Sequence, residues 1–241
     1  MEPKLQLQLV IRRVSLQSGI DWISQAWQLF KRHYAVLISM VMFMAGLSLA
    51  ANISPILLIV LLLANPFLTA GFYRAIVQLQ KEQQVRFSDL FIVFSQAQYR
   101  RVFLRLASAN VLMNIPLTLL ATELVEQMKQ GQIEPMLMFG TVAMVSLIFM
   151  LFAYAVAIAY FLNEQRLLVI LNASLTACWR NVAALSLFGL LAVALGMFGV
   201  VTFFIGFVVV LPVLQVAFFL SFSSIFALQV GPTQEQSTLE V

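Results

Sequence analysis

The chain has 241 residues, of which 62% are hydrophobic and only 10% are charged. An ordinary soluble domain is about 45–50% apolar and about 25% charged, so this composition excludes a water-soluble protein and leaves too little polar sequence for a separate soluble domain. The net charge of +4 does not indicate nucleic-acid binding, because the basic residues flank apolar runs and form no basic fold of their own. We therefore expect a single membrane domain over residues 1–241.

The N-terminal segment, residues 1–19, alternates apolar and polar side chains over residues 5–9. It lacks the continuous apolar stretch of a cleavable signal peptide. We expect this segment to stay in the cytoplasm and the first span to serve as the insertion signal.

Residues 20–33 predict an amphipathic helix, because apolar side chains fill one half of its helical wheel and polar side chains fill the other. Trp22 and Trp27 suit the headgroup layer, and Lys31 and Arg32 suit anionic lipid. These four residues are the candidate interfacial lipid contacts. The simpler interpretation is an interfacial anchor that leads into span one, and the alternatives are lipid sensing or docking into the groove of a partner.

Residues 34–73 contain no charged residue and no histidine. As one helix they would be about 60 Å long, twice the roughly 30 Å thickness of the hydrocarbon core, so they have to fold back. The turn is expected at Asn52-Ile53-Ser54-Pro55, where the proline suits the first turn of the next helix. This predicts span one over residues 35–51 and span two over residues 56–77.

The middle of the chain predicts a second interfacial helix over residues 87–99, followed by span three over residues 102–121. Span three contains Arg105, which lies close enough to the helix end to reach the headgroups, and Pro116, which predicts a kink. Span four is predicted over residues 136–162, which are apolar and uncharged throughout.

The last charge-free stretch, residues 182–228, would be about 70 Å long as one helix. It predicts span five over residues 182–199 and span six over residues 205–228, with a cytoplasmic tail over residues 229–241.

The two ends of the chain show signs of an internal repeat. Residues 168–180 stand before span five as residues 20–32 stand before span one, in a register close to 148 residues. Pro66 and Pro212 each lie in the middle of the second span of their hairpin. Because both copies start on the same side of the membrane, the pattern indicates a parallel duplication.

The basic residues predict the orientation. Thirteen of the 14 Lys and Arg lie on the side of the chain ends, and only Lys129 lies on the other, in a loop that also holds three glutamates. The positive-inside rule places the thirteen in the cytoplasm, with both termini. The predicted fold class is an all-α polytopic bundle of six spans with interfacial amphipathic helices on its cytoplasmic side.

Motifs that carry catalysis are absent from the sequence: there is no HExxH, Walker phosphate loop, GxSxG elbow or GxGxxG fingerprint. The single histidine, His33, has no catalytic partner nearby in the sequence. The single cysteine, Cys178, is typical of a small buried residue. No span has a carboxylate in its middle, which argues against proton coupling through carboxylates. We predict no catalytic residues, no cofactor-binding residues and no metal ligands, and therefore a protein that is not an enzyme.

The polar residues and prolines within the spans allow two interpretations. In the first, the regions of Pro66 and Pro212 are two facing broken helices around a polar cavity, whose lining would include Asn65, Thr69 and Gln215. In the second, the polar side chains are satisfied by hydrogen bonds between packed helices, with no continuous void. The candidate cavity or packing residues are Asn65, Pro66, Thr69, Asn110, Asn114, Pro212 and Gln215.

A family resemblance rests on three features. The run from Ile20 to Arg32 leads into span one, Pro66 and Gly71 follow in span two, and the next basic loop contains Ser88-Asp89-Leu90-Phe91. With these features the chain resembles the YciC-like proteins, a group of uncharacterised bacterial inner-membrane proteins with six spans. It is also similar to the membrane domain attached to some glycerophosphodiester phosphodiesterases. The resemblance covers most of the chain and implies the bacterial inner membrane, but it implies no catalytic residues, and the phosphodiesterase domain itself is absent. Such families often carry a proline after the basic cluster, whereas this chain has Tyr34 at that position.

The sequence thus predicts a non-enzymatic membrane module that acts through lipid or partner contacts. The alternative is a small transporter or lipid-handling protein with a polar cavity between the proline-containing spans. The expected partners are the lipid bilayer, with anionic headgroups on its cytoplasmic face, and either another membrane protein or further copies of this chain. Nucleic acid is not an expected partner.

Overall fold

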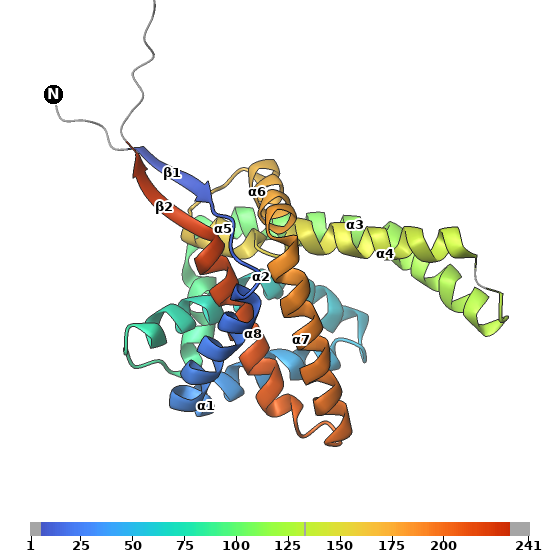
Figure 1. Cartoon of the computed structure of the whole chain (residues 1–241), viewed down its shortest axis with the longest axis horizontal. Coiled ribbons are helices and arrows are strands. Elements are labelled where there is room, and N and C mark those ends of the chain that lie inside the picture. Colours follow the sequence, from blue (N-terminus) through green and yellow to red (C-terminus); the bar gives the residue numbers. More distant parts are fainter. Residues whose placement is uncertain (1–5, 133, 232–241) are drawn as a thin grey trace, which may run out of the picture.

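A computed structural model of the chain describes residues 6–132 and 134–231 (Figure 1). The described part consists mainly of helices, and six of them are long and apolar enough to cross a membrane. The predicted all-α polytopic fold is therefore confirmed. The six candidate spans are Ser18–Ala50, Ile56–Gln80, Ala97–Lys129, Pro135–Phe161, Val182–Val201 and Phe207–Ile225.

Helix α1, Ser18–Ala50, is two helices joined at His33, whose φ of −132° and ψ of 28° leave the helical region. The break lies where the sequence predicts the end of the amphipathic helix and the start of span one. The amphipathic half buries the positions Trp22, Ala26 and Phe30. These positions are four residues apart and therefore share one face of the helix.

The same arrangement recurs 148 residues later in the chain. Helix α6, Leu167–Arg180, ends at Asn181, whose φ of −119° and ψ of 22° nearly repeat those of His33, and α7, Val182–Val201, begins directly afterwards. The buried positions correspond as well, because α6 buries Ile170, Ser174 and Cys178. The similarity found in the sequence thus extends to the backbone and to the pattern of burial.

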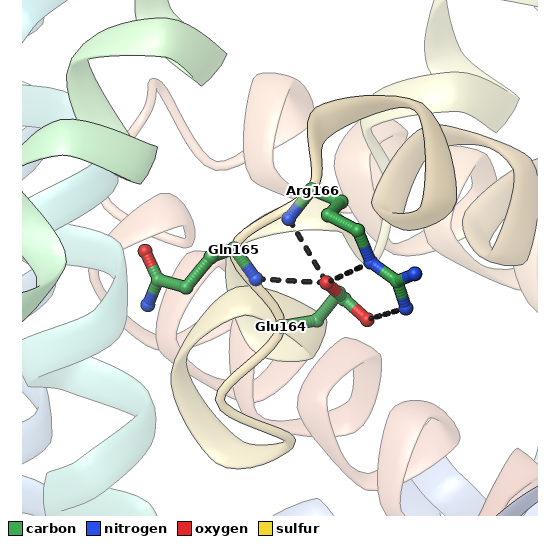
Figure 2. Close-up of polar contacts among 3 residues, drawn as sticks. All are labelled: Glu164, Gln165 and Arg166. Carbon is green, nitrogen blue, oxygen red and sulfur yellow. Dashed lines mark hydrogen bonds and ion pairs between the residues drawn. The ribbon is translucent and has the colours of Figure 1, made fainter.

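The turn that leads into α6 is organised by one carboxylate (Figure 2). Glu164 accepts hydrogen bonds from the backbone N–H groups of Gln165 and Arg166 and from the guanidinium of Arg166. The hydrogen bond from the Arg166 side chain is the main reason that the pKa of Glu164 falls to about 2. The carboxylate therefore stays ionised and holds the turn at neutral pH.

Helix α2, Pro55–Gln80, starts with a proline at its first helical position and continues through Pro66. The 3-10 helix η1, Phe87–Ser95, packs closely on α2 at Gly71, where a Cβ atom would overlap the backbone carbonyl of Leu90. The second predicted interfacial helix is therefore a shorter 3-10 helix, and α3 begins within the predicted range.

Helices α3, Ala97–Lys129, and α4, Pro135–Phe152, form a long hairpin that extends away from the rest of the bundle (Figure 1). The helix is interrupted after α4 and continues as α5, Ala155–Phe161. The hydroxyl of Ser174 in α6 spans this break, since it donates to the carbonyl of Met150 at 2.8 Å and accepts from the N–H of Tyr154 at 3.1 Å. One side chain of α6 thus satisfies backbone groups that the break in the helix exposes.

Helix α8, Phe207–Ile225, packs mainly against α1. Strand β2, Phe226–Gly231, follows it and pairs antiparallel with β1, Gln6–Ile11. Span six therefore ends before the predicted residue 228, because the chain turns from helix to strand. The alternation near the N-terminus belongs to a strand, in which side chains repeat with a period of two. The pairing of β1 with β2 brings both ends of the described chain to one side of the bundle. Residues 1–5 and 232–241, which belong to the two predicted cytoplasmic segments, lie outside the described residues.

Candidate functional site

A cavity of about 490 Å³ lies among α2, α4, α7 and α8, and so includes both helices that carry an internal proline in the predicted repeat. Most of its wall is apolar, with Phe149, Phe188 and Leu214 among the lining residues. Three polar side chains face it, Thr69 and Tyr73 from α2 and Gln215 from α8. The structure thus places Thr69 and Gln215, two residues of the predicted polar cavity, beside a hollow whose wall is mainly apolar.

The local sequence explains why these groups converge. Thr69 and Tyr73 are four residues apart and therefore share one face of α2. Pro66 and Pro212 are buried, and each stands three residues before a polar lining residue in the sequence. A proline inside a helix has no N–H to donate to the carbonyl four residues earlier. Each proline therefore leaves one helical carbonyl, that of Leu62 or Val208, without its usual partner, and neither of these residues lines the cavity.

The polar side chains of the cavity differ from other buried polar groups in how they are satisfied. Asn181, for example, binds three backbone groups, and the hydroxyl of Tyr154 lies 2.8 Å from that of Ser221. The side chains of Thr69, Tyr73 and Gln215 line the cavity instead. Their donors and acceptors are therefore available to a molecule in the cavity.

The cavity is the wider part of a groove along the side of the bundle. A second hollow of about 300 Å³ lies among α4, α6 and α7 and shares Phe149 and Leu185 with the first. Among the described elements, α4 makes no extensive contact with α7 or α8, and the α3–α4 hairpin points away from both (Figure 1). Phe149 is 55% exposed at this edge. None of the described residues that line the two hollows is charged.

The other predicted cavity residues lie elsewhere. Asn65 is on the same face of α2 as Thr69 but one turn nearer the α1–α2 loop, where it is exposed and beyond the cavity. Asn110 and Asn114 lie on α3, where the amide of Asn114 donates to the carbonyl and side-chain oxygens of Asn110 at 2.7 and 3.2 Å. The expectation that Asn65 lines the cavity is therefore wrong.

The predicted interfacial residues divide into two groups. Trp22 is only 2% exposed, and its indole N–H donates to the hydroxyl of Ser224 in α8 at 3.0 Å. Its assignment as a lipid contact is wrong, because α8 covers this side of the amphipathic helix and supplies a hydrogen-bond acceptor. Trp27, Lys31 and Arg32 are exposed. The guanidinium of Arg32 lies 3.9 Å from the carboxylate of Glu82 in a largely solvated pair, which contributes little to stability.

The structure adds residues to the site that the sequence does not identify. Tyr73 follows Thr69 by one helical turn, and this spacing is a signal that would have found it. Phe149 and Gly189 come from distant parts of the chain, and no local pattern links either of them to α2. Within the described residues, no three His, Cys, Asp or Glu side chains gather as a metal site. Burial raises the pKa of the Cys178 thiol to about 12, so the thiol stays neutral and is a poor nucleophile at neutral pH.

The fold and the groove together define a multi-pass helical membrane protein with a cavity that opens at its side. No protein-family model, no curated protein and no solved structure matches the chain. The site is therefore interpreted from its own geometry.

Proposed function

We propose that this protein is a non-enzymatic protein of the bacterial inner membrane that binds an uncharged lipid in the groove between α4 and α7. The observation that carries the proposal is the cavity of about 490 Å³, whose mainly apolar wall includes the polar side chains of Thr69, Tyr73 and Gln215. Polar groups in an apolar site are favourable when they form hydrogen bonds. A bound ligand with its own polar group forms such bonds with the cavity wall.

The size and lining of the cavity support a lipid ligand. Pockets for small molecules have volumes of about 300–1,000 Å³ and apolar walls with a few polar groups that fix orientation. The groove opens at the side of a chain with six candidate spans, and this side faces lipid in a bilayer. A ligand therefore enters from the membrane, which favours lipid handling over the transport of a water-soluble solute.

The chemistry of the lining supports an uncharged polar group. An ion taken into an apolar site without a counter-ion costs several kcal/mol, and no charged side chain lines the groove in the part of the chain that the structure describes. Hydroxyl, ester and amide groups match the hydroxyls of Thr69 and Tyr73 and the amide of Gln215. An acylglycerol or a long-chain alcohol has this chemistry, whereas a phospholipid headgroup or a free fatty acid does not.

The proposal includes the orientation of the chain. The distribution of Lys and Arg supports cytoplasmic ends, and the pairing of β1 with β2 brings both ends to one side of the bundle. The resemblance to the YciC-like proteins supports the bacterial inner membrane and stays a prediction. Reporter fusions to each end of the chain test the orientation, and opposite locations of the two reporters would contradict it.

Gly189 offers a direct test of the site, because a Cβ atom added there meets no atom within 4 Å and the residue lines the cavity. Gly189→Phe therefore fills the cavity. Gly196→Phe is the matched control, since Gly196 lies two turns further along α7, outside the cavity, and also has open space around it. We expect a photoreactive diacylglycerol in nanodiscs to label the wild-type protein and Gly196→Phe, but to label Gly189→Phe at least five times less. Equal labelling of all three proteins, or stronger labelling by a photoreactive phosphatidylglycerol, would contradict the proposal.

A further inference from the structure

The turn between α7 and α8, residues 202–206, presents a row of bulky apolar side chains at one tip of the bundle (Figure 1). Phe203, Phe204 and Ile205 are 88%, 67% and 74% exposed. Phe203 and Phe204 also have positive φ angles, of 53° and 67°. Turns in water usually place Gly, Asn or Asp in this left-handed conformation, and a bulky side chain there is strained. Exposed rings on such a backbone are unfavourable in water, so the turn indicates another environment.

The turn between α3 and α4 shows the opposite choice of residues. It contains Gln130, Gly131, Gln132 and Glu134, and the residue with a positive φ, of 71°, is Gly131. In the predicted topology both turns lie on the side of the membrane away from the chain ends. The α3–α4 turn thus has the chemistry of a turn in water, and the α7–α8 turn does not.

The backbone N–H groups of the α7–α8 turn are satisfied within the turn itself. Every N–H group of residues 202–208 donates to an acceptor within residues 198–205, at 3.0–3.2 Å. The hydroxyl of Thr202 takes part, because it accepts from the N–H of Gly206 and donates to the carbonyl of Gly199, both at 3.0 Å. Lipid offers no hydrogen bonds, so a backbone within it has to satisfy its polar groups internally. The N–H groups of this turn meet that condition.

The length of α7 indicates how deep the turn lies. α7 has 20 residues and is about 30 Å long, no longer than the roughly 30 Å hydrocarbon core. The amphipathic half of α1, which the sequence predicts at the interface, meets α7 near its start, since a Cβ atom added at Gly19 would lie 2.7 Å from the carbonyl oxygen of Ala184. From Ala184 to Val201 the helix rises only about 26 Å. Helix α3, with 33 residues, is about 50 Å long and carries its own turn well beyond that depth.

We infer that the α7–α8 turn stays in the acyl-chain layer of the far leaflet, where Phe203, Phe204 and Ile205 contact lipid chains. Lipid fits better than water because the turn has bulky apolar side chains and no charge. Lipid also fits better than a protein partner, since the N–H groups of the turn are already engaged and offer a partner no hydrogen bond. The inference is independent of the lipid groove, because no residue of the turn lines either hollow.

Quenching of tryptophan fluorescence in liposomes tests the environment of the turn. Phe203→Trp and the control Gln132→Trp are made in a background in which the three native tryptophans are replaced by phenylalanine. We expect phospholipids with brominated acyl chains to quench Phe203→Trp at least five times more strongly than Gln132→Trp, and iodide on both sides of the membrane to quench in the reverse order. Equal quenching of the two variants by either probe would overturn the inference. Protection of Phe203→Trp from both probes would overturn it as well, since protein would then cover the turn.

Cysteine labelling provides a second test with a smaller change at a position that needs no positive φ. Cys178→Ser removes the only cysteine, and a single cysteine then replaces Ile205 or, as the control, Gln132. Freezing and thawing the membranes lets a charged maleimide reach both faces, so the test does not depend on the orientation of the chain. We expect Gln132→Cys to react at least five times faster than Ile205→Cys in membranes, and both to react equally in SDS. Equal rates in membranes, including no reaction of either variant, would overturn the inference.

Discussion

The hydroxyl groups of Tyr154 and Ser221 lie 2.8 Å apart in the core, where they join the start of α5 to α8. Tyr154 is 1% exposed and stacks on Phe218 with ring centroids 5.3 Å apart. Ser221 also donates to the carbonyl of Phe218. The serine therefore has two partners, whereas the tyrosine hydroxyl has one.

This asymmetry predicts that two conservative replacements differ in cost. Tyr154→Phe removes the hydroxyl and leaves Ser221 with its backbone partner, so we expect a loss of about 1 kcal/mol in the free energy of unfolding. Ser221→Ala leaves the buried tyrosine hydroxyl without a partner, and we expect a loss of about 1–3 kcal/mol. Unfolding titrations in mixed micelles measure both values. A larger loss for Tyr154→Phe would contradict the assignment.

The contact of α2 with η1 predicts a strong effect of a single methyl group. In Gly71→Ala the new Cβ atom overlaps the carbonyl of Leu90, and the two elements have to separate. We expect a loss of about 1–3 kcal/mol, as for overpacked cores. Gly46→Ala is the control, because a Cβ there meets no atom within 4 Å, and we expect it to be neutral or stabilising by up to about 1 kcal/mol. Thermal unfolding of both variants checks the difference.

The turn before α6 predicts a dependence of stability on pH. The pKa of Glu164 is about 2 in the folded protein, below its ordinary value of about 4.3. The ionised carboxylate therefore stabilises the fold at pH values above about 4.3, and this contribution is lost as the pH falls from there toward 2. We expect the wild-type protein to lose more stability than Glu164→Gln between pH 6 and pH 3. Parallel pH profiles of the melting temperature would contradict this account.

The two tryptophans of the amphipathic helix predict opposite responses to lipid. Trp22 is buried against α8, whereas Trp27 is 43% exposed and stacks on Phe30. In single-tryptophan variants, with the other two tryptophans replaced by phenylalanine, we expect brominated lipids to quench the fluorescence of Trp27 and to leave that of Trp22 nearly unchanged. Quenching of Trp22 as strong as that of Trp27 would show that α8 does not cover it.

Much of the fold can be predicted from the sequence because the membrane limits the alternatives. A charge-free run longer than the bilayer has to form a hairpin, and this reasoning locates the turns near Asn52 and Gly199. The break in α1 at His33 is also predictable, since the amphipathic pattern ends there. The strand pairing of residues near Leu9 with the end of the chain is not, because it depends on contacts far apart in the sequence.

The site is predictable only in part. The prolines of α2 and α8 direct attention to Thr69 and Gln215, and the structure places both in the cavity. Trp22 shows why the surroundings of a side chain on an amphipathic helix are harder to predict than the position of a hairpin. An amphipathic helix presents the same apolar face to lipid and to protein, and only the position of α8 decides between them.

The pairing of β1 with β2 has a consequence for biosynthesis. Residues 6–11 leave the ribosome first, and their partners, residues 226–231, leave it after the last span has been made. Strand β1 therefore stays unpaired until all six helices have been inserted. Loss of residues 226–231 would leave that strand without its partner, and this makes the synthesis of β2 a checkpoint for completion of the fold.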